Sequence, residues 1–336
     1  MASHNSPNAH RAPASTARKV RSYLAMTGVA LGCLFGVWKA LRPEPHPYVD
    51  FAGGRPDTDE ESGAVIPETD NSDSLRFAVA TMWSVQSTFT LYRQLVTRIA
   101  RDTGRKSAFV LRPSYTELRH AFERGQIDVA FVCAGPYVRM LSRGSARLLV
   151  QPEFVPGLSY HSALVVPESS SATCLTDLAG KSIAFSDRES FTGCLVPCLS
   201  LVKQGADPGT FFGKVIYSGS HDQSIEAVDR GLADAAALHS IVWRSAIRAE
   251  PALGQRLKVI HRSEAFGPPP VVVPCGGDLT LQASIQEALL ALHTDSEGVR
   301  ILEELSIRRF IPPRARDYDT AVDVYEQLQA ATESMP

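Results

Sequence analysis

Arg124-Gly125-Gln126-Ile127-Asp128-Val129-Ala130 and Arg230-Gly231-Leu232-Ala233-Asp234-Ala235-Ala236 are two copies of one phrase, 106 residues apart in a chain of 336. The same offset continues upstream without a gap, where it sets Ser114-Tyr115 on Ser220-His221. Two stretches of similar sequence, each carrying serine at matching places, indicate two similar structural units. We expect them to form two lobes that close on one small polar ligand.

The similarity extends well beyond the phrase itself. Between 76–131 and 182–237, eleven of 56 aligned positions are identical. Unrelated stretches of ordinary composition would share roughly three or four. The excess supports a repeated unit of secondary structure rather than a chance match of a short motif.

Each unit has the pattern of alternating strands and helices. Short apolar runs predict strands, and the segments between them have apolar residues at helical spacing. Strands that alternate with helices form mostly parallel sheets, so the expected fold class is α/β with two lobes. The strands are expected near 76–81, 108–111 and 129–133 in the first unit, and near 182–186, 215–217 and 233–238 in the second.

The rest of the chain divides around these units. Extended apolar segments at 148–156, 162–167, 259–261 and 271–274 suit crossings between lobes, and from Leu279 to near Ser334 the pattern is helical and expected to pack on the first lobe. The predicted organisation is a cytoplasmic stub and membrane segment at 1–41, a tether at 42–74, lobe 1 at 75–166, lobe 2 at 167–262 and a return to lobe 1 at 263–336.

Residues 22–38 carry no charge and follow Arg18, Lys19 and Arg21. A run of roughly 17 apolar residues is near the lower limit for crossing a bilayer. No small-residue cleavage site with a polar exit follows, so an uncleaved signal anchor is favoured over a lipoprotein modified at Cys33. The preceding basic residues place the body outside the cytoplasm, on the periplasmic face of the inner membrane.

Charge and cysteine content exclude several classes of function. The formal net charge is −2, and 44% of residues are hydrophobic and 21% charged, which is typical of a globular protein without a basic surface for nucleic acid. The six cysteines lack the paired spacing of a metal site, so neither a metal nor another cofactor is expected. An anionic ligand would have to be held by local dipoles.

The candidate binding residues stand where helices begin. In open α/β sheets, ligands bind beyond the carboxyl ends of the strands, where unpaired backbone N–H groups and the helix dipole can hold an oxyanion. Four serines occupy such places, although any one of them could simply cap its helix. They are Ser84, Ser114, Ser190 and Ser220, and Thr192 and Gly193 share the third helix start.

His221 is the most chemically specific of these residues, and Tyr115 is its counterpart in the first unit. An imidazole N–H and a phenol O–H are both good donors to a tetrahedral oxyanion. Asp128 and Asp234 have two interpretations. In the first, each aspartate fixes the turn that follows the second helix of its repeat unit, and the symmetric placement of the two residues favours this role. In the second, Asp234 accepts a hydrogen bond from a ligand amine.

Several segments closely resemble the phosphonate/phosphite-type periplasmic substrate-binding proteins, in the right order over roughly 75–310. The most specific is Tyr217–Val228 (YSGSHDQSIEAV); the others are Ser186–Gly193 (SDRESFTG), Gly125–Phe131 (GQIDVAF) and Gly135–Val138 (GPYV). The segment 187–190 reads Asp-Arg-Glu-Ser, where the family usually has Asp-Pro-x-Ser. This departure alters the rim of the site.

The resemblance implies a type II periplasmic-binding-protein fold that closes on a phosphonate, phosphite, phosphate or related oxyanion. It implies that Ser190, Thr192 and His221 hold the oxyanion and that Tyr137 closes the pocket from the first lobe. The expected role is delivery of this ligand to an ABC permease.

Two alternatives use the same residues. A sensing module for a membrane signalling partner would keep the fold and the ligand. A hydrolase would use Ser190, His221 and Asp222, but the chain has no G-x-S-x-G elbow, and an aspartate adjacent to the histidine in sequence is poorly placed to orient its ring. No enzymatic activity is expected.

Overall fold

The computed structural model describes residues 73–334, which contain both repeat units. The predicted membrane segment at 22–38 and almost all of the predicted tether at 42–74 lie outside the described residues. Within 73–334, none of the helices combines the length and apolar character that a membrane crossing requires.

The first sheet has six strands in the order β11-β4-β10-β3-β1-β2. The strands of the first repeat unit, β1, β2 and β3, pair in parallel, whereas β10, β4 and β11 are antiparallel additions. Their bounds are β1 Ser74–Val79, β2 Lys106–Val110, β3 Val129–Phe131, β4 Ala146–Phe154, β10 Val271–Pro274 and β11 Ile307–Ile311.

The second sheet has five strands in the order β7-β6-β8-β5-β9 and repeats the plan of the first. Here β6, β7 and β8 pair in parallel, and β5 is antiparallel to both β8 and β9. The bounds are β5 Ser162–Pro167, β6 Ser182–Phe185, β7 Lys214–Tyr217, β8 Ala235–His239 and β9 Leu257–Arg262. The predicted two-lobed α/β class is therefore what the structure shows.

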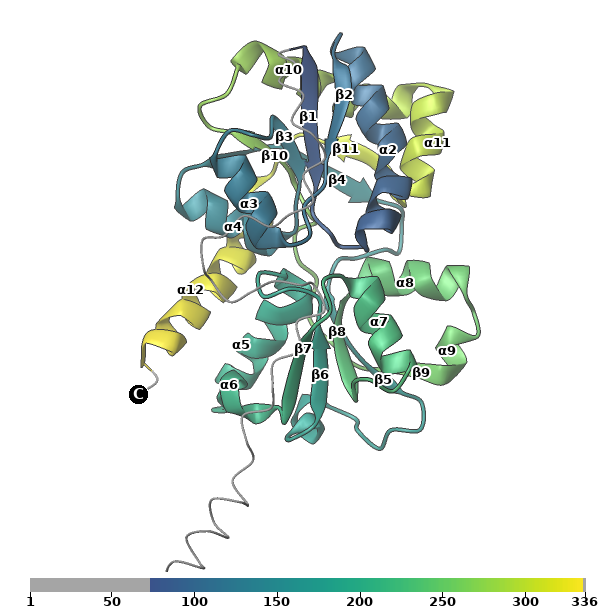
Figure 1. Cartoon of the computed structure of the whole chain (residues 1–336), viewed down its shortest axis with the longest axis vertical. Helices are drawn as coiled ribbons and strands as arrows, with labels where there is room; N and C mark the ends of the chain where they lie inside the picture. Colours follow the sequence, from purple (N-terminus) through teal and green to yellow (C-terminus); the bar gives the residue numbers. More distant parts are fainter. Residues whose placement is uncertain (1–72, 335–336) are drawn as a thin grey trace, which may run out of the picture. The chain divides into compact units, whose positions relative to one another are not determined.

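Helices cover the faces of these sheets (Figure 1). Helix α2 packs on β1 and β2 through Leu95, Val96 and Ile99, which are fully or almost fully buried at helical spacing. The helices are α2 Val85–Asp102, α3 Tyr115–Glu123, α4 Ala134–Ser142, α5 Val196–Lys203, α6 Pro208–Phe211, α7 His221–Asp229, α8 Ser240–Ala249, α9 Leu253–Arg256, α10 Leu279–Ala291, α11 Ser296–Glu304 and α12 Asp319–Ser334, with the π-helical turn η2 at Phe191–Leu195 and 3-10 turns η1 Leu175–Leu178, η3 Leu292–Thr294 and η4 Ala315–Tyr318.

Two links carry the chain between the sheets. The first, 155–161, joins β4 to β5, and the second, 263–270, joins β9 to β10. The predicted lobe boundary at 166/167 falls at the end of β5, yet β5 pairs only with strands of the second sheet. Because β5 belongs to the second sheet, the boundary between the lobes lies earlier in the chain, within the link 155–161.

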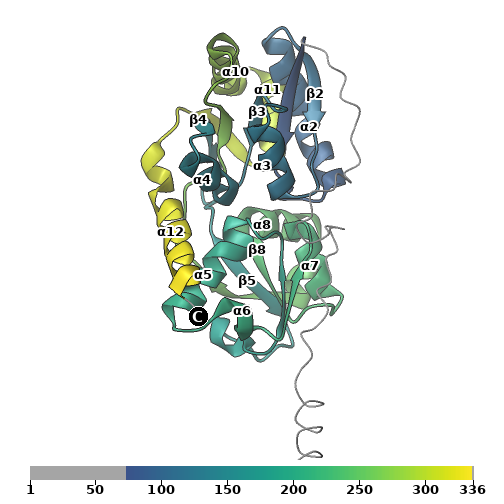
Figure 2. The ribbon, with the colours of Figure 1, turned by 60° about the vertical axis from the view of Figure 1, so that its left-hand side comes forward.

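The C-terminal region differs from the continuous helical pattern that we expected. It contains β11, which extends the first sheet by pairing with β4. Helix α12 then contacts α4 of the first lobe and α5 of the second (Figure 2). The expected packing on the first lobe is thus only part of what α12 does.

The aspartates of the repeated phrase hold the strands together at their starting ends. The Asp128 carboxylate accepts hydrogen bonds from the backbone N–H of Arg76 (2.8 Å) and from its guanidinium. Asp234 does the same for Ser182, from the backbone (2.8 Å) and the hydroxyl (2.6 Å). Arg76 and Ser182 are themselves 106 residues apart, so the two lobes make the same aspartate-to-backbone hydrogen bond at equivalent positions.

Candidate functional site

All four predicted serines precede helical turns, at the carboxyl ends of parallel strands. Ser114, Ser190 and Ser220 accept hydrogen bonds from the backbone N–H groups of Glu117, Gly193 and Gln223, as N-caps do. Ser84 precedes α2 but makes no such bond; its hydroxyl donates to Ser87 at 2.9 Å. Three of the four serines therefore serve as caps, and a role in ligand binding requires further evidence.

His221 is fully buried, and its surroundings fix its tautomer. The backbone N–H of His239 donates to His221 Nδ1 at 3.2 Å, so that nitrogen carries no proton. The proton of the neutral ring is then on Nε2, which lies 3.5 Å from Ser186 Oγ and 3.4 Å from Ser190 Oγ. Burial lowers the pKa of His221 to about 3, and a hydrogen bond with the Ala237 backbone acts in the opposite direction. The imidazole is a neutral donor.

Gly193 lies where these polar groups converge. A methyl group in place of its hydrogen would come closer than 3.0 Å to the Ser186 hydroxyl, the His221 ring and the Ser190 hydroxyl. The backbone N–H of Gly193 donates to Ser190 Oγ at 3.2 Å. Only glycine fits at this helix start, because the space beside it is taken by the side chains that could bind an anion.

Some buried hydroxyl groups here have no hydrogen-bond partner. Thr192 and Tyr115 are fully buried, and neither Thr192 Oγ1 nor the Tyr115 hydroxyl has a hydrogen-bond partner in the described part of the chain. Thr81 Oγ1, on the loop between β1 and α2, is a third such atom. Leaving a buried polar group unpaired costs on the order of 1–3 kcal/mol, so such groups near one site suggest that a polar ligand completes their bonding.

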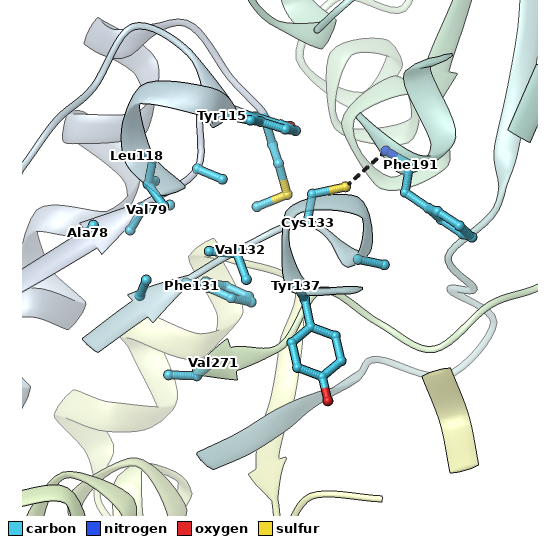
Figure 3. Close-up of a cluster of buried hydrophobic side chains, with 14 of the residues drawn as sticks. Ala78, Val79, Tyr115, Leu118, Phe131, Val132, Cys133, Tyr137, Phe191 and Val271 are labelled. Carbon is cyan, nitrogen blue, oxygen red and sulfur yellow. Dashed lines mark hydrogen bonds between the residues drawn. The ribbon is translucent and has the colours of Figure 1, made fainter. Parts of the chain in front are cut away.

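Tyr115 begins α3 in the first lobe and faces residues of the second. Burial raises the pKa of its phenol well above the ordinary value. Figure 3 shows Tyr115 on one side of Cys133, whose sulfur accepts a hydrogen bond from the Phe191 backbone at 3.4 Å. The phenol is thus a neutral donor close to the start of η2.

Two predicted residues are not brought to this group. The ring of Tyr137 packs edge-on against Tyr318 at 5.0 Å, and its hydroxyl points away from Tyr115 in Figure 3. Asp234 is exposed, and its carboxylate bonds Ser182 at the opposite end of β6 from Ser190. Asp234 therefore has the structural role that its symmetry favoured, and the alternative of a bond to a ligand amine is dropped.

Contacts between the lobes surround the site and were not predicted from sequence. The second helix of each repeat unit, α3 or α7, is hydrogen-bonded at its first residue to the other lobe. The Asp187 carboxylate accepts a hydrogen bond from the Tyr115 backbone N–H at 3.1 Å, and the Met82 carbonyl accepts one from the His221 backbone N–H at 3.1 Å. Asp222 accepts from the Ser84 backbone at 2.8 Å. Ser186 was also missed as a site residue, although it directly follows β6 and begins the resembling segment Ser186–Gly193. The four strand-end loops meet around one centre.

The geometry does not provide a catalytic triad. A general base for Ser190 would need an unprotonated His221 Nε2, but Nδ1 is the nitrogen that accepts. Asp222 bonds Ser84 and Ser220 rather than the ring. Within residues 73–334, no cluster of histidine, cysteine or acidic residues has the arrangement of a metal site. What the site offers is a set of neutral donors.

Comparison with known proteins shows the family to which this chain belongs. Residues 77–318 match the family model described as ABC transporter, phosphonate, periplasmic substrate-binding protein. The phosphate-import protein PhnD of Mycolicibacterium smegmatis is 25% identical over 259 residues, covering 73% of this chain and 75% of the relative.

Two solved structures show the same fold. PhnD1 of Prochlorococcus marinus, in complex with methylphosphonate, is similar with a TM-score of 0.69 at 18% identity, covering 77% of this chain and 99% of the other. A binding-protein component of an ABC phosphonate transporter from Pseudomonas aeruginosa has a TM-score of 0.69 at 17% identity, with 78% and 98% covered. The family match spans most of the chain, and the protein belongs to the periplasmic substrate-binding proteins of phosphonate ABC transporters.

Proposed function

We propose that this protein captures a phosphonate, phosphite or phosphate-like oxyanion outside the cytoplasm and delivers it to an ABC permease. One observation carries the proposal: the buried His221 Nε2 lies 3.5 Å from the Ser186 hydroxyl and 3.4 Å from the Ser190 hydroxyl, at the start of η2. The Thr192 hydroxyl of the same turn has no hydrogen-bond partner among the described residues. Tyr115 would add a donor from the first lobe. The names of the relatives, which include a phosphate importer and a protein bound to methylphosphonate, support the same ligand class.

The donors suit an oxyanion because they are neutral and fixed. Within residues 73–334, none of the hydrogen bonds of Ser190, Thr192 or His221 involves a lysine or arginine. An anion would then be held by hydroxyl, imidazole and backbone N–H groups at the start of η2 and α5, where the helix dipole favours negative charge.

The expected attachment to the membrane through residues 22–38 is part of the proposal and rests on sequence alone. Delivery to a permease is favoured over sensing because the family is that of transporter components. Uptake of phosphonate into vesicles that contain the cognate permease would separate the two roles. A requirement for this protein supports delivery, and unchanged uptake in its absence contradicts it.

Isothermal titration with phosphate, phosphite, methylphosphonate and 2-aminoethylphosphonate tests the binding itself. The Ser190→Ala and Thr192→Val variants should each weaken binding by on the order of 1–3 kcal/mol, because each removes a hydrogen bond to a charged ligand. Ser284→Ala is the matched control, since that exposed hydroxyl bonds only its own helix in α10. Absence of binding across the whole panel would overturn the proposal.

A further inference from the structure

Two cysteines of the second lobe adjoin the candidate anion site. Cys194 belongs to η2 and directly follows Gly193, and Cys198 lies four residues later, in α5. Cys194 is 5% exposed and Cys198 is half-buried. Both side chains pack on the same apolar core of the second lobe, and a hydrogen bond joins the two thiols. The pair is therefore in contact within one turn of chain.

The spacing of the pair suits a disulfide after a small movement. Residues four apart on a helix have Cβ atoms about 5–6 Å apart, whereas a disulfide needs about 3.5–4.5 Å. Pro197 lies between them at the start of α5 and has no backbone N–H to bond back to η2, which leaves this junction less constrained. Within residues 73–334, no third histidine, cysteine or acidic side chain joins the pair, so it lacks the ligands of a metal site.

The two thiols have different parts in forming such a bond. A hydrogen bond with Cys198, together with burial, raises the pKa of the Cys194 thiol well above its ordinary value. Cys198, the more exposed of the two, is therefore the thiol that reacts first, because the thiolate is the nucleophile. The family acts in the periplasm, and disulfides form and persist in that compartment.

The reaction with a small disulfide such as glutathione disulfide balances in two steps. The Cys198 thiolate attacks one sulfur of the oxidant, forms a mixed disulfide and releases one glutathione. Cys194 then gives up its proton and attacks the Cys198 sulfur, which releases the second glutathione. The protein loses two protons and two electrons, and the oxidant becomes two thiols.

The bond would act on the anion site through Gly193, which has no free space beside it. A methyl group on Gly193 would come closer than 3.0 Å to Ser186, Ser190 and His221, and the Gly193 backbone N–H donates to Ser190 Oγ at 3.2 Å. Drawing Cys194 toward Cys198 by about 1 Å displaces the adjoining Gly193. Binding groups must be held to within about 0.5 Å of their productive positions, so this displacement should weaken binding.

We propose that Cys194 and Cys198 are a modification site, in which a disulfide oxidant outside the cytoplasm links the two thiols and the linked form binds the oxyanion more weakly. The effect on binding rests on the proposed function. The formation of the bond does not.

Peptide mass analysis tests the bond. The full chain is treated with glutathione disulfide, its remaining thiols are blocked, and it is digested with trypsin. Cleavage after Arg188 and Lys203 gives the peptide 189–203, whose only cysteines are Cys194 and Cys198. This peptide should be lighter by two hydrogen atoms and should carry no blocking group. Cys194→Ser should instead hold glutathione at Cys198, and Cys198→Ser should leave Cys194 unmodified.

Titration with methylphosphonate tests the consequence, before oxidation, after it and after reduction with dithiothreitol. The oxidised protein should bind about tenfold more weakly, as expected for the loss of one hydrogen bond to a charged group, and reduction should restore the affinity. Cys198→Ser should bind normally and ignore the oxidant. Cys275→Ser is the matched control, because Cys275 is exposed and belongs to the first lobe; this variant should respond to the oxidant as the unmodified protein does.

The outcomes separate this inference from the proposed function. If the peptide 189–203 keeps two free thiols, the modification site is overturned. If the disulfide forms and the affinity for methylphosphonate is unchanged, the effect on binding is overturned. If the reduced protein binds neither phosphate nor methylphosphonate, the proposed function fails and the effect on binding fails with it, whereas a disulfide found in the peptide still establishes the modification site.

Discussion

The protonation state of His221 is set by burial and by one backbone hydrogen bond, and this has a consequence at acid pH. Its pKa is about 3 in the folded protein and about 6.5 when unfolded. Because the folded pKa is the lower one, the neutral ring contributes stability that is present above about pH 6.5 and is lost as the pH falls toward 3.

We predict that His221→Gln reduces this acid sensitivity. Between pH 7.5 and 5.5, the unmodified protein should lose about 1 kcal/mol more unfolding free energy than the variant does, because only the unfolded histidine takes up a proton there. Urea unfolding at both pH values measures this. Burial also lowers the pKa of His239 and raises the pKa of Asp187. Both effects are present in the unmodified protein and in the variant, so they largely cancel when the two proteins are compared. Equal losses in the two proteins would contradict the assigned state of the ring.

Among the secondary-structure elements, η2 depends strongly on one residue, because a methyl group added at Gly193 would collide with the side chains of Ser186, Ser190 and His221. Gly193→Ala should destabilise the protein by about 1–3 kcal/mol through overpacking and should weaken binding of phosphate or methylphosphonate. Thermal unfolding and titration measure the two effects. Gly276→Ala is the control, since a methyl group there meets nothing within 4 Å. A Gly193→Ala protein that binds normally would show that the space beside the glycine is unimportant.

Elements whose pattern is local were predictable from sequence. The helix starts at Ser114, Ser190 and Ser220 and the strands of both repeat units follow from apolar spacing and capping residues. Strand β11 was not predicted, because Ile307–Ile311 directly follows a helical segment and becomes a strand only by pairing with β4, about 155 residues away in sequence. The same limit applies to Tyr137. The family resemblance implied that it closes the pocket, but its ring packs on Tyr318, which lies 181 residues later in the sequence.

At the scale of the whole molecule, an ion-pair cluster centred on Glu189 joins the two lobes. Glu189 belongs to the second lobe, and its carboxylate is only 4% exposed. It accepts hydrogen bonds from three side chains of the first lobe: Arg119 at 3.1 Å, Arg139 at 2.6 Å and Thr116 at 3.1 Å. Movement of the lobes apart about the links 155–161 and 263–270 would separate these groups, so the cluster stabilises the closed arrangement specifically.

We predict that Glu189→Gln lowers ligand affinity by about tenfold or more without touching the ligand. Hydrogen bonds to charged groups contribute about 1.5–3 kcal/mol. The substitution weakens these bonds only in the closed form, because only the closed form makes them. Small-angle scattering with saturating phosphate or methylphosphonate should show a larger radius of gyration for the variant than for the unmodified protein. Glu123→Gln is the matched control, because Glu123 pairs with Arg119 and Arg143 inside the first lobe. An equal loss of affinity in both variants would mean that Glu189 stabilises α3 rather than closure.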